Sequence, residues 1–378
     1  MSEIVIVSKQ QRLIIDPPTR TVAVVATGPQ GPPGPVGATG PTGPQGVPGS
    51  LYLARNRIIN GGFDVWQRGG GGFTVNGAYT ADQWVMLVAG TTHLVTRQTF
   101  TPGNPIPGRE PAYHIQANVT SVPGAANYAI LGNRIESVRT FAGQQVTFSF
   151  SAAADAPKNM AVEFTQDFGI GGSPSPGLSV YSTLVALTTG FNRYTITFTI
   201  PSIAGKTLGT SNDGWLTANF WFDAGSSMAA RAANLGQQSG VFRIADVQLE
   251  AGPAASAFEV KPYGDTLVQC QRYLRAFGGY GGNEEVAYGF FISATAANVG
   301  VNLSPSMRDT PTIAVTGAWQ FSDGVTGFAA SSIAISPNLS SARLVCVTGN
   351  TTGATAFRPC RLECANVNTA RIFLSSEL

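Results

Sequence analysis

The sequence predicts a mainly β protein whose folded parts are β-sandwiches. Charged residues make up only 12% of the 378 residues, and the chain contains 45 glycines and 24 prolines. Such a composition favours turns and short strands over long solvated helices. Many short runs alternate apolar and polar residues, as strands with one face on a core do. At roughly 100 to 200 residues per domain, the length indicates two or three folded units.

The charge balance argues against two classes of partner. Lys plus Arg number 23 and Asp plus Glu number 21, so the net charge of +2 gives no long-range field for nucleic acid or an anionic membrane. The apolar runs fall short of the roughly 18 residues that a membrane helix needs. The N-terminal apolar stretch carries charges, unlike a signal peptide. We therefore expect no nucleic-acid partner, no membrane insertion and no secretion signal.

The first 27 residues contain three short β-rich runs, at 4–7, 12–15 and 21–25. A segment of this size cannot bury a useful core alone. We predict an N-terminal β anchor over 1–27 that completes its core by trimerising or by adding strands to another protein's sheet edge. A small β cap that only nucleates the following segment is the alternative.

Glycine then recurs at every third position, at Gly28, Gly31, Gly34, Gly37, Gly40, Gly43, Gly46 and Gly49. When three polyproline-II chains wind together, every third residue faces the crowded axis and must lack a side chain. A disordered Pro/Gly linker has a similar composition but no reason to keep this period. We predict a collagen-like triple helix over 28–49, and hence a homotrimer. At about 3.1 Å per residue this rod is on the order of 65 Å long.

Residues 50–277 are predicted to form a jelly-roll β-sandwich. Apolar side chains fall on alternate residues in 146–151 and 194–200, as in strands with one face in water. With these two included, nine apolar runs follow each other at short intervals, at 84–88, 93–97, 112–117, 127–131, 145–151, 160–165, 194–200, 215–222 and 241–249. Eight or nine such strands suit a two-sheet sandwich.

A short helix is predicted to close this sandwich. Asp265 would cap it, and its apolar face would hold Leu267, Cys270, Leu274 and Phe277.

Residues 278–378 are predicted to form a second, smaller β-sandwich at the distal tip. Its apolar runs lie at 286–293, 298–304, 312–319, 331–335, 342–348, 356–364 and 370–374. Within the 356–364 run, Cys360 and Cys364 have an even offset that places them on one strand face. We expect buried free thiols there; a disulfide between Cys346 and either of them is the alternative.

Three segments resemble bacteriophage fibre proteins. NRIINGGFDVWQRG at 56–69, followed by ADQW at 81–84, is similar to the opening of a sandwich domain of tail-fibre-like proteins. VQLEAGPAASAFEVKPYGDTLVQCQRYLRAF at 247–277 resembles the close of that domain, and VNLSPSMRDTPTIAVTGAW at 301–319 resembles a C-terminal tip domain.

The resemblance implies a trimeric virion fibre, assembled in the host cytoplasm, that is anchored by its N-terminus on the particle. Its distal domains would meet a host cell-surface glycan or protein. The first 27 residues match no anchor pattern that we can name, so tail, neck and capsid all stay open as the docking site. A purely structural or decorating fibre without a specific receptor is an alternative function. A bacterial surface protein with a collagen-like stalk is a further one, although no secretion signal supports it.

Motifs for catalysis are missing from the sequence, which has no nucleophile elbow, HExxH pair or complete phosphate loop. A glycan depolymerase would need two carboxylates about 5 to 10 Å apart, and the sequence does not show which acidic residues converge. The four cysteines and two histidines lack zinc-site spacing. We expect a protein that is not an enzyme and has no catalytic residues, metal or cofactor, with the depolymerase as an alternative.

Sugar binding needs a flat aromatic ring against the C–H face of the sugar and polar groups for its hydroxyls. Four of the five tryptophans lie among apolar neighbours and are expected in the core: Trp66, Trp84, Trp215 and Trp221. The candidates for ligand contact are therefore in the last hundred residues: Trp319, Tyr280 and Tyr288.

Overall fold

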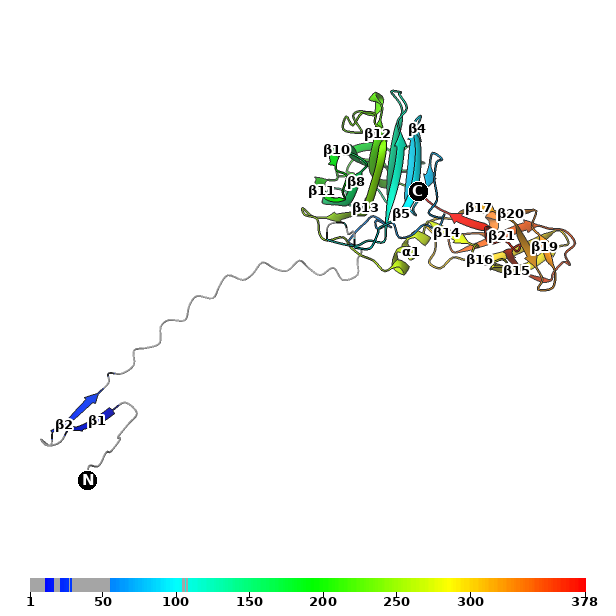
Figure 1. The fold of residues 1–378 in the computed structure, drawn as a ribbon. Helices are drawn as coiled ribbons and strands as arrows, with labels where there is room; N and C mark the ends of the chain where they lie inside the picture. The colour runs from blue at the N-terminus through cyan, green and yellow to red at the C-terminus, as the bar shows by residue number, and fades with distance from the viewer. Residues whose placement is uncertain (1–10, 17–20, 27, 29–54, 104–105, 107) are drawn as a thin grey trace. The chain divides into compact units, whose positions relative to one another are not determined.

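The computed structural model describes residues 11–16, 21–26, 28, 55–103, 106 and 108–378. It contains two units, Met1–Leu51 and Tyr52–Leu378 (Figure 1). In the first unit, β1 (Gln11–Asp16) pairs antiparallel with β2 (Thr21–Ala26). Both strands were predicted. The predicted strand at 4–7, and the glycine repeat 28–49 apart from Gly28, lie outside the described residues.

The second unit contains an antiparallel sheet of six strands in the spatial order β10-β9-β12-β7-β4-β3. These strands are β3 (Ala78–Tyr79), β4 (Trp84–Ala89), β7 (Tyr128–Glu136), β9 (Lys158–Asp167), β10 (Leu178–Leu187) and β12 (Trp215–Ala224). A five-stranded sheet in the order β11-β8-β13-β6-β5 faces it. Its strands are β5 (Thr92–Thr99), β6 (Tyr113–Thr120), β8 (Gln145–Ala154), β11 (Asn192–Thr199) and β13 (Gly240–Ala251).

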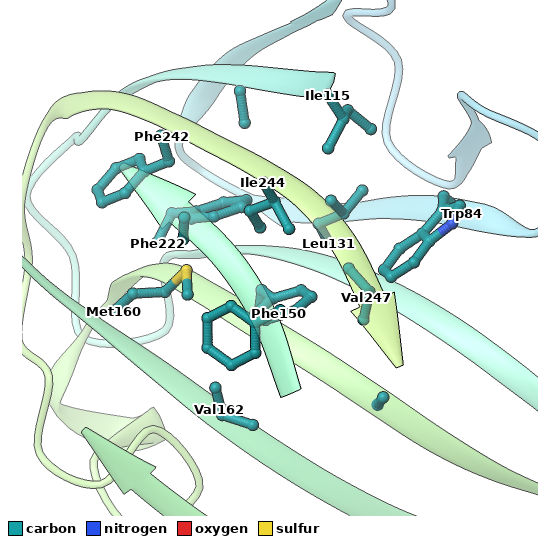
Figure 2. Packing of buried hydrophobic residues seen from close by; sticks show 14 of the residues in the cluster. Trp84, Ile115, Leu131, Phe150, Met160, Val162, Phe222, Phe242, Ile244 and Val247 are labelled. Carbon is teal, nitrogen blue, oxygen red and sulfur yellow. The ribbon is translucent and has the colours of Figure 1, made fainter. Parts of the chain in front are cut away.

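One core joins the two sheets into the predicted sandwich. Figure 2 shows Leu131 and Phe222 from the six-stranded sheet, and Phe150 and Ile244 from the five-stranded sheet, within the same buried cluster. Apolar side chains on alternate residues of each strand supply this core. The arrangement agrees with the jelly-roll type that we predicted.

The prediction that β8 turns its other face to water was wrong. Thr147 and Ser149, which alternate with the core phenylalanines, are fully buried. Thr147 donates a hydrogen bond to Gly252 O at 2.8 Å, and Arg193 Nη2 donates to Ser149 Oγ at 2.6 Å. Neighbouring segments thus cover this face with polar contacts, which a strand's own alternation does not reveal.

Of the four tryptophans that we expected in the core, Trp66, Trp84 and Trp221 are buried, whereas Trp215 is only half-buried. Trp66 and Trp84 belong to the core, with exposed fractions of 7% and 0%. Trp221 is also fully buried, in a separate cluster, and its Nε1 donates to the buried Glu163 at 3.0 Å. Trp215 is half-buried, with the guanidinium of Arg134 at 4.8 Å from its ring centroid.

The predicted helix exists as α1 (Tyr263–Gln271), but its ends differ from the prediction. Pro262 occupies the N-cap, and Asp265 lies in the first turn, where its charge complements the helix dipole. Leu274 and Phe277 belong instead to β14 (Leu274–Phe277), which pairs with the strand β23 (Arg371–Ser375). A pairing partner almost a hundred residues away therefore overrides the local helical pattern.

Two sheets build the C-terminal β-sandwich that we predicted. A seven-stranded sheet has the order β19-β18-β22-β15-β16-β21-β20, and a three-stranded sheet has the order β14-β23-β17. The further strands are β15 (Glu285–Ser293), β16 (Ala296–Asn302), β17 (Thr312–Thr316), β18 (Trp319–Ser322), β19 (Gly327–Ala329), β20 (Ser332–Ile335), β21 (Leu344–Asn350) and β22 (Pro359–Cys364). Val347 and Leu362 from the larger sheet share one core with Leu374 from the smaller.

The cysteines are unpaired, as we expected. Cys270, Cys360 and Cys364 are buried and Cys346 is half-buried. Burial raises the pKa of Cys360 to about 11, so this thiol stays protonated and unreactive at neutral pH. Among the described residues, no helix has the length and apolar character to span a membrane.

Candidate functional site

A cleft of about 330 Å³ combines exposed aromatic rings with polar side chains. The loop 66–69, helix α1, residues 276–280 and the start of β23 line it. From α1, Tyr263, Leu267 and Gln271 contribute, and their spacing of four residues places them on one side of the helix. Tyr263 is 58% exposed. A cleft of this size fits the lower end of the range for small-ligand sites, which is about 300 to 1,000 Å³.

Tyr280, one of the predicted contact residues, lines this cleft and is 93% exposed. The chain reaches it through Gly278 and Gly279, whose φ angles of 87° and 94° suit glycine. Glu284 holds the loop, because its carboxylate accepts hydrogen bonds from the backbone N–H groups of Gly278 at 3.3 Å and Tyr280 at 2.8 Å. The backbone is thus fixed while the ring projects into solvent.

Trp319 was expected to contact ligand, but the structure places it in the core of the C-terminal sandwich. It is only 3% exposed, and its Nε1 donates to Thr316 O at 3.0 Å. Its ring lies under the turn that leads to Tyr280, since a Cβ added at Gly278 would come within 2.9 Å of the indole. Trp319 therefore supports the loop and offers no exposed face to a sugar.

Tyr288, the third candidate, lies on β15 in the seven-stranded sheet and is 65% exposed. Its hydroxyl donates to Glu285, and this hydrogen bond raises the pKa of Tyr288. Tyr288 is not among the residues that line the cleft. The structure thus brings only Tyr280, of the three candidates, into this cleft.

Arg371 supplies a guanidinium group to the cleft. Its Nη1 donates to the backbone oxygens of Asn368 at 3.1 Å and Ala370 at 3.0 Å. The group packs directly against Gly279, where an added Cβ would lie 1.5 Å from Nη1. Glycine at this position is therefore required by close approach as well as by its backbone angle.

The loop 66–69 is fixed by the buried carboxylate of Asp82, which accepts hydrogen bonds from the backbone N–H of Gln67 at 2.9 Å and from its Nε2 at 2.5 Å. Gln67 Nε2 also donates to Leu274 O at 2.9 Å, which ties the loop to β14. Burial raises the pKa of Asp82. This wall of the cleft is therefore rigidly held.

Arg68, in the same loop, forms a two-pronged ion pair with Glu377 at 2.6 and 3.2 Å. The Glu377 side chain is only 5% exposed. Burial raises the pKa of Glu377 to about 7, although Arg68 opposes the shift. This carboxyl group therefore titrates near neutral pH.

We expect the stability of the protein to depend on pH through Glu377. Because its folded pKa of about 7 lies above the ordinary value of 4.5, its stabilising contribution is present at low pH and is lost as pH rises through 7. At about 1.4 kcal/mol per pKa unit, the free energy of unfolding should fall by on the order of 2 to 3 kcal/mol between pH 5 and 8. Chemical denaturation of wild type and Glu377→Gln across this range isolates the effect. Parallel pH curves for the two proteins would contradict it.

Two of the other hollows differ clearly from this cleft. One, beside the bulge in β13, is lined by Asp64, Arg109 and Phe258, but its volume of about 20 Å³ admits little more than one water. The other, of about 390 Å³, lies along β10 and β11. Only threonine, tyrosine and aliphatic side chains line it, and Tyr181 is stacked on Phe198 at 4.3 Å. It lacks the amide and guanidinium groups of the cleft.

Several carboxylates that could serve as the catalytic pair of a depolymerase already form hydrogen bonds or ion pairs within the protein. Glu163, fully buried, contacts Asn219, Trp221 and Arg231. Glu285 and Glu363 come together on β15 and β22, but both contact Arg361, at 3.1 and 2.6 Å. In the part of the chain that the structure describes, no three His, Cys, Asp or Glu side chains gather as a metal site requires.

Sequence reasoning missed Tyr263, Gln271 and Arg371 as members of the site. The spacing of Tyr263 and Gln271 along α1 was an available signal, because it places them on one side of the helix together with Leu267. Arg371 gave no such signal. It reaches the cleft only because β23 pairs with β14.

No family model matches the chain, and a search of the curated proteins finds no relative. Among solved structures, "CBM4 structure and function" aligns with 52% of this chain and 99% of its own, at 16% identity and a TM-score of 0.30. The enzymatically active domain of bacteriophage CBA120 tailspike protein 4 aligns over 52% of this chain and 22% of its own, at 16% identity and a TM-score of 0.31. TmCBM61 in complex with β-1,4-galactotriose aligns over 53% and 100%, at 13% identity and a TM-score of 0.29. At these scores the likenesses carry no functional argument.

Proposed function

We propose that the protein is a trimeric fibre of a bacteriophage particle that attaches to a host cell-surface glycan. In this proposal residues 1–27 dock on the tail, neck or capsid, the Gly-X-Y repeat 28–49 joins three chains, and the two sandwiches are displayed distally. The protein acts by multivalent display and not by catalysis.

The cleft is the observation that carries the glycan part of the proposal. Tyr263 and Tyr280 are 58% and 93% exposed, so their rings are open to the C–H face of a sugar. The hydroxyls of these tyrosines and the amide of Gln271 form no hydrogen bond to the described part of the protein. These groups therefore remain available for sugar hydroxyls. The resemblance of 56–69, 247–277 and 301–319 to fibre proteins supports the phage setting.

The proposal is tested with the full chain on an array of bacterial lipopolysaccharides and capsular polysaccharides. We expect at least one polysaccharide to bind, and Tyr280→Ala to weaken that binding by about tenfold or more, as loss of a central aromatic contact does. Tyr288→Ala is the matched control, because it removes another exposed tyrosine outside the cleft. It should bind like wild type.

Three results would overturn parts of the proposal. If no polysaccharide binds, a structural or decorating fibre without a specific receptor becomes the better hypothesis. If Tyr288→Ala loses binding and Tyr280→Ala does not, the site lies on the seven-stranded sheet. An increase in reducing ends during incubation would show the glycan depolymerase.

A further inference from the structure

The charged side chains of the cleft indicate which class of glycan would bind there. Two cationic side chains line it, Arg68 and Arg371, and no carboxylate does. Glu377 compensates Arg68 through the ion pair described above. Among the described residues, no carboxylate lies within 4.0 Å of the Arg371 guanidinium. Arg371 is thus the charge of the cleft that is left without an ionic partner.

The nearby acid Glu284 does not neutralise Arg371 by direct contact. Its two oxygens accept the backbone N–H groups of Gly278 and Tyr280, at 3.3 and 2.8 Å. Glu284 therefore holds the loop, and among the described residues it forms no ion pair with Arg371 within 4.0 Å.

The guanidinium is also held in place. Nη1 donates to the backbone oxygens of Asn368 and Ala370, and the group lies so close to Gly279 that a Cβ added there would come within 1.6 Å of Cζ. Nε and Nη2 donate to no acceptor in the described part of the chain. An arginine fixed in this way retains N–H donors that suit an oxyanion, and little side-chain entropy is lost when an oxyanion binds.

We infer that the cleft recognises an acidic glycan, whose carboxylate or phosphate contacts Arg371 while a sugar ring lies against Tyr280 or Tyr263. This inference rests on the proposed function and names the ligand class for the same cleft. Oxyanions form charge-assisted hydrogen bonds with guanidinium groups, which are roughly twice as strong as neutral ones. A neutral glycan would leave the fixed charge unpaired.

To test this inference, each polysaccharide is printed on the array in three forms: native, carboxyl-reduced and dephosphorylated. We expect the bound polysaccharide to lose about tenfold or more in affinity when its own acidic group is removed, because a hydrogen bond to a charged group contributes about 1.5 to 3 kcal/mol. The carboxyl-reduced and dephosphorylated forms distinguish a uronic-type acid from a phosphate. Binding of the native form should also weaken as salt is added, since the Debye length falls from about 10 Å at 0.1 M to about 3 Å at 1 M.

Variants of the full chain assign the effect to Arg371. Arg371→Gln should lose the preference for the native over the neutralised form, and Arg371→Lys should retain part of it. Arg139→Gln is the matched control, because Arg139 is exposed and its side chain has no hydrogen bond to the described residues. It should leave binding unchanged. The salt dependence is measured on wild type, so it does not depend on whether a variant folds.

The possible failures are distinguishable. If the neutralised forms bind as tightly as the native ones and Arg371→Gln binds as wild type does, the acidic-glycan inference is wrong, while the proposed function stands. If no form of any polysaccharide binds, the proposed function itself fails.

Discussion

Replacing Trp84 with alanine is expected to lower the free energy of unfolding by about 3 to 5 kcal/mol, the range for deleting a large buried aromatic side chain. Trp84 is fully buried at the start of β4. Its ring lies 4.9 Å from Phe63 and 6.2 Å from Phe220, and Nε1 donates to Asn60 O at 3.1 Å. The substitution leaves a cavity and removes one of the two hydrogen bonds that Asn60 O accepts; the other, from the backbone N–H of Phe63 at 3.1 Å, remains. The residue joins the segment around Asn60 and Phe63 to the six-stranded sheet.

Guanidinium denaturation of the full chain measures this loss. Trp215→Ala is the matched control, because Trp215 is a half-buried tryptophan at the start of β12 in the same sandwich, in contact with Arg134. Its loss should be clearly smaller, since less apolar surface leaves the core. Equal losses for the two variants would contradict the assignment of Trp84 to the centre of the core.

Most strands of both sandwiches could be predicted because the alternation of apolar and polar residues is visible within each strand alone. In β8, Val146, Phe148 and Phe150 alternate with polar residues, and the structure places all three in the core. The edge strand β10 was missed although it has ten residues. The bulge between Ser179 and Tyr181, where β10 pairs with β9, interrupts the alternation of its apolar residues. Its position at a sheet edge does not explain the miss, because the edge strand β11 alternates clearly and was predicted.

The candidate site was predictable only in part, because it depends on contacts between distant segments. Tyr280 and Trp319 looked alike in the sequence, since both are aromatic residues beside glycine-containing turns. The structure separates them: Glu284 holds the loop that exposes Tyr280, whereas Trp319 lies beneath the same loop. Arg371 joins Tyr263 in the cleft through the pairing of β14 with β23. The local periodicity of the sequence had assigned the residues of β14 to a helix.

The arrangement of the chain suggests why one weak cleft per copy would be sufficient. Linking several binding modules makes the later binding events intramolecular, so overall avidity exceeds single-site affinity without any new contact. In the proposed fibre this linkage comes from the Gly-X-Y repeat, and its effect is separable from that of the cleft.

Disrupting the glycine period of residues 28–49 is therefore expected to lower apparent affinity for host cells by about 10²- to 10⁴-fold. The variant scrambles the order of these residues in the full chain, so that its composition is kept and the three-residue spacing is lost. Without glycine at each third position the proposed triple helix cannot close, and each cleft must bind alone. Light scattering would then report single chains in place of trimers.

The matched control exchanges only the residues between the glycines and leaves Gly28, Gly31 and every later third position in place. It should remain trimeric and bind cells as wild type does, because packing at the axis depends on the glycines. If both scrambled proteins stay trimeric, the flanking β segments hold the chains together and the repeat is a spacer only. If wild type itself is a single chain that binds as tightly as the scrambled form, the trimeric fibre and its avidity mechanism are both wrong.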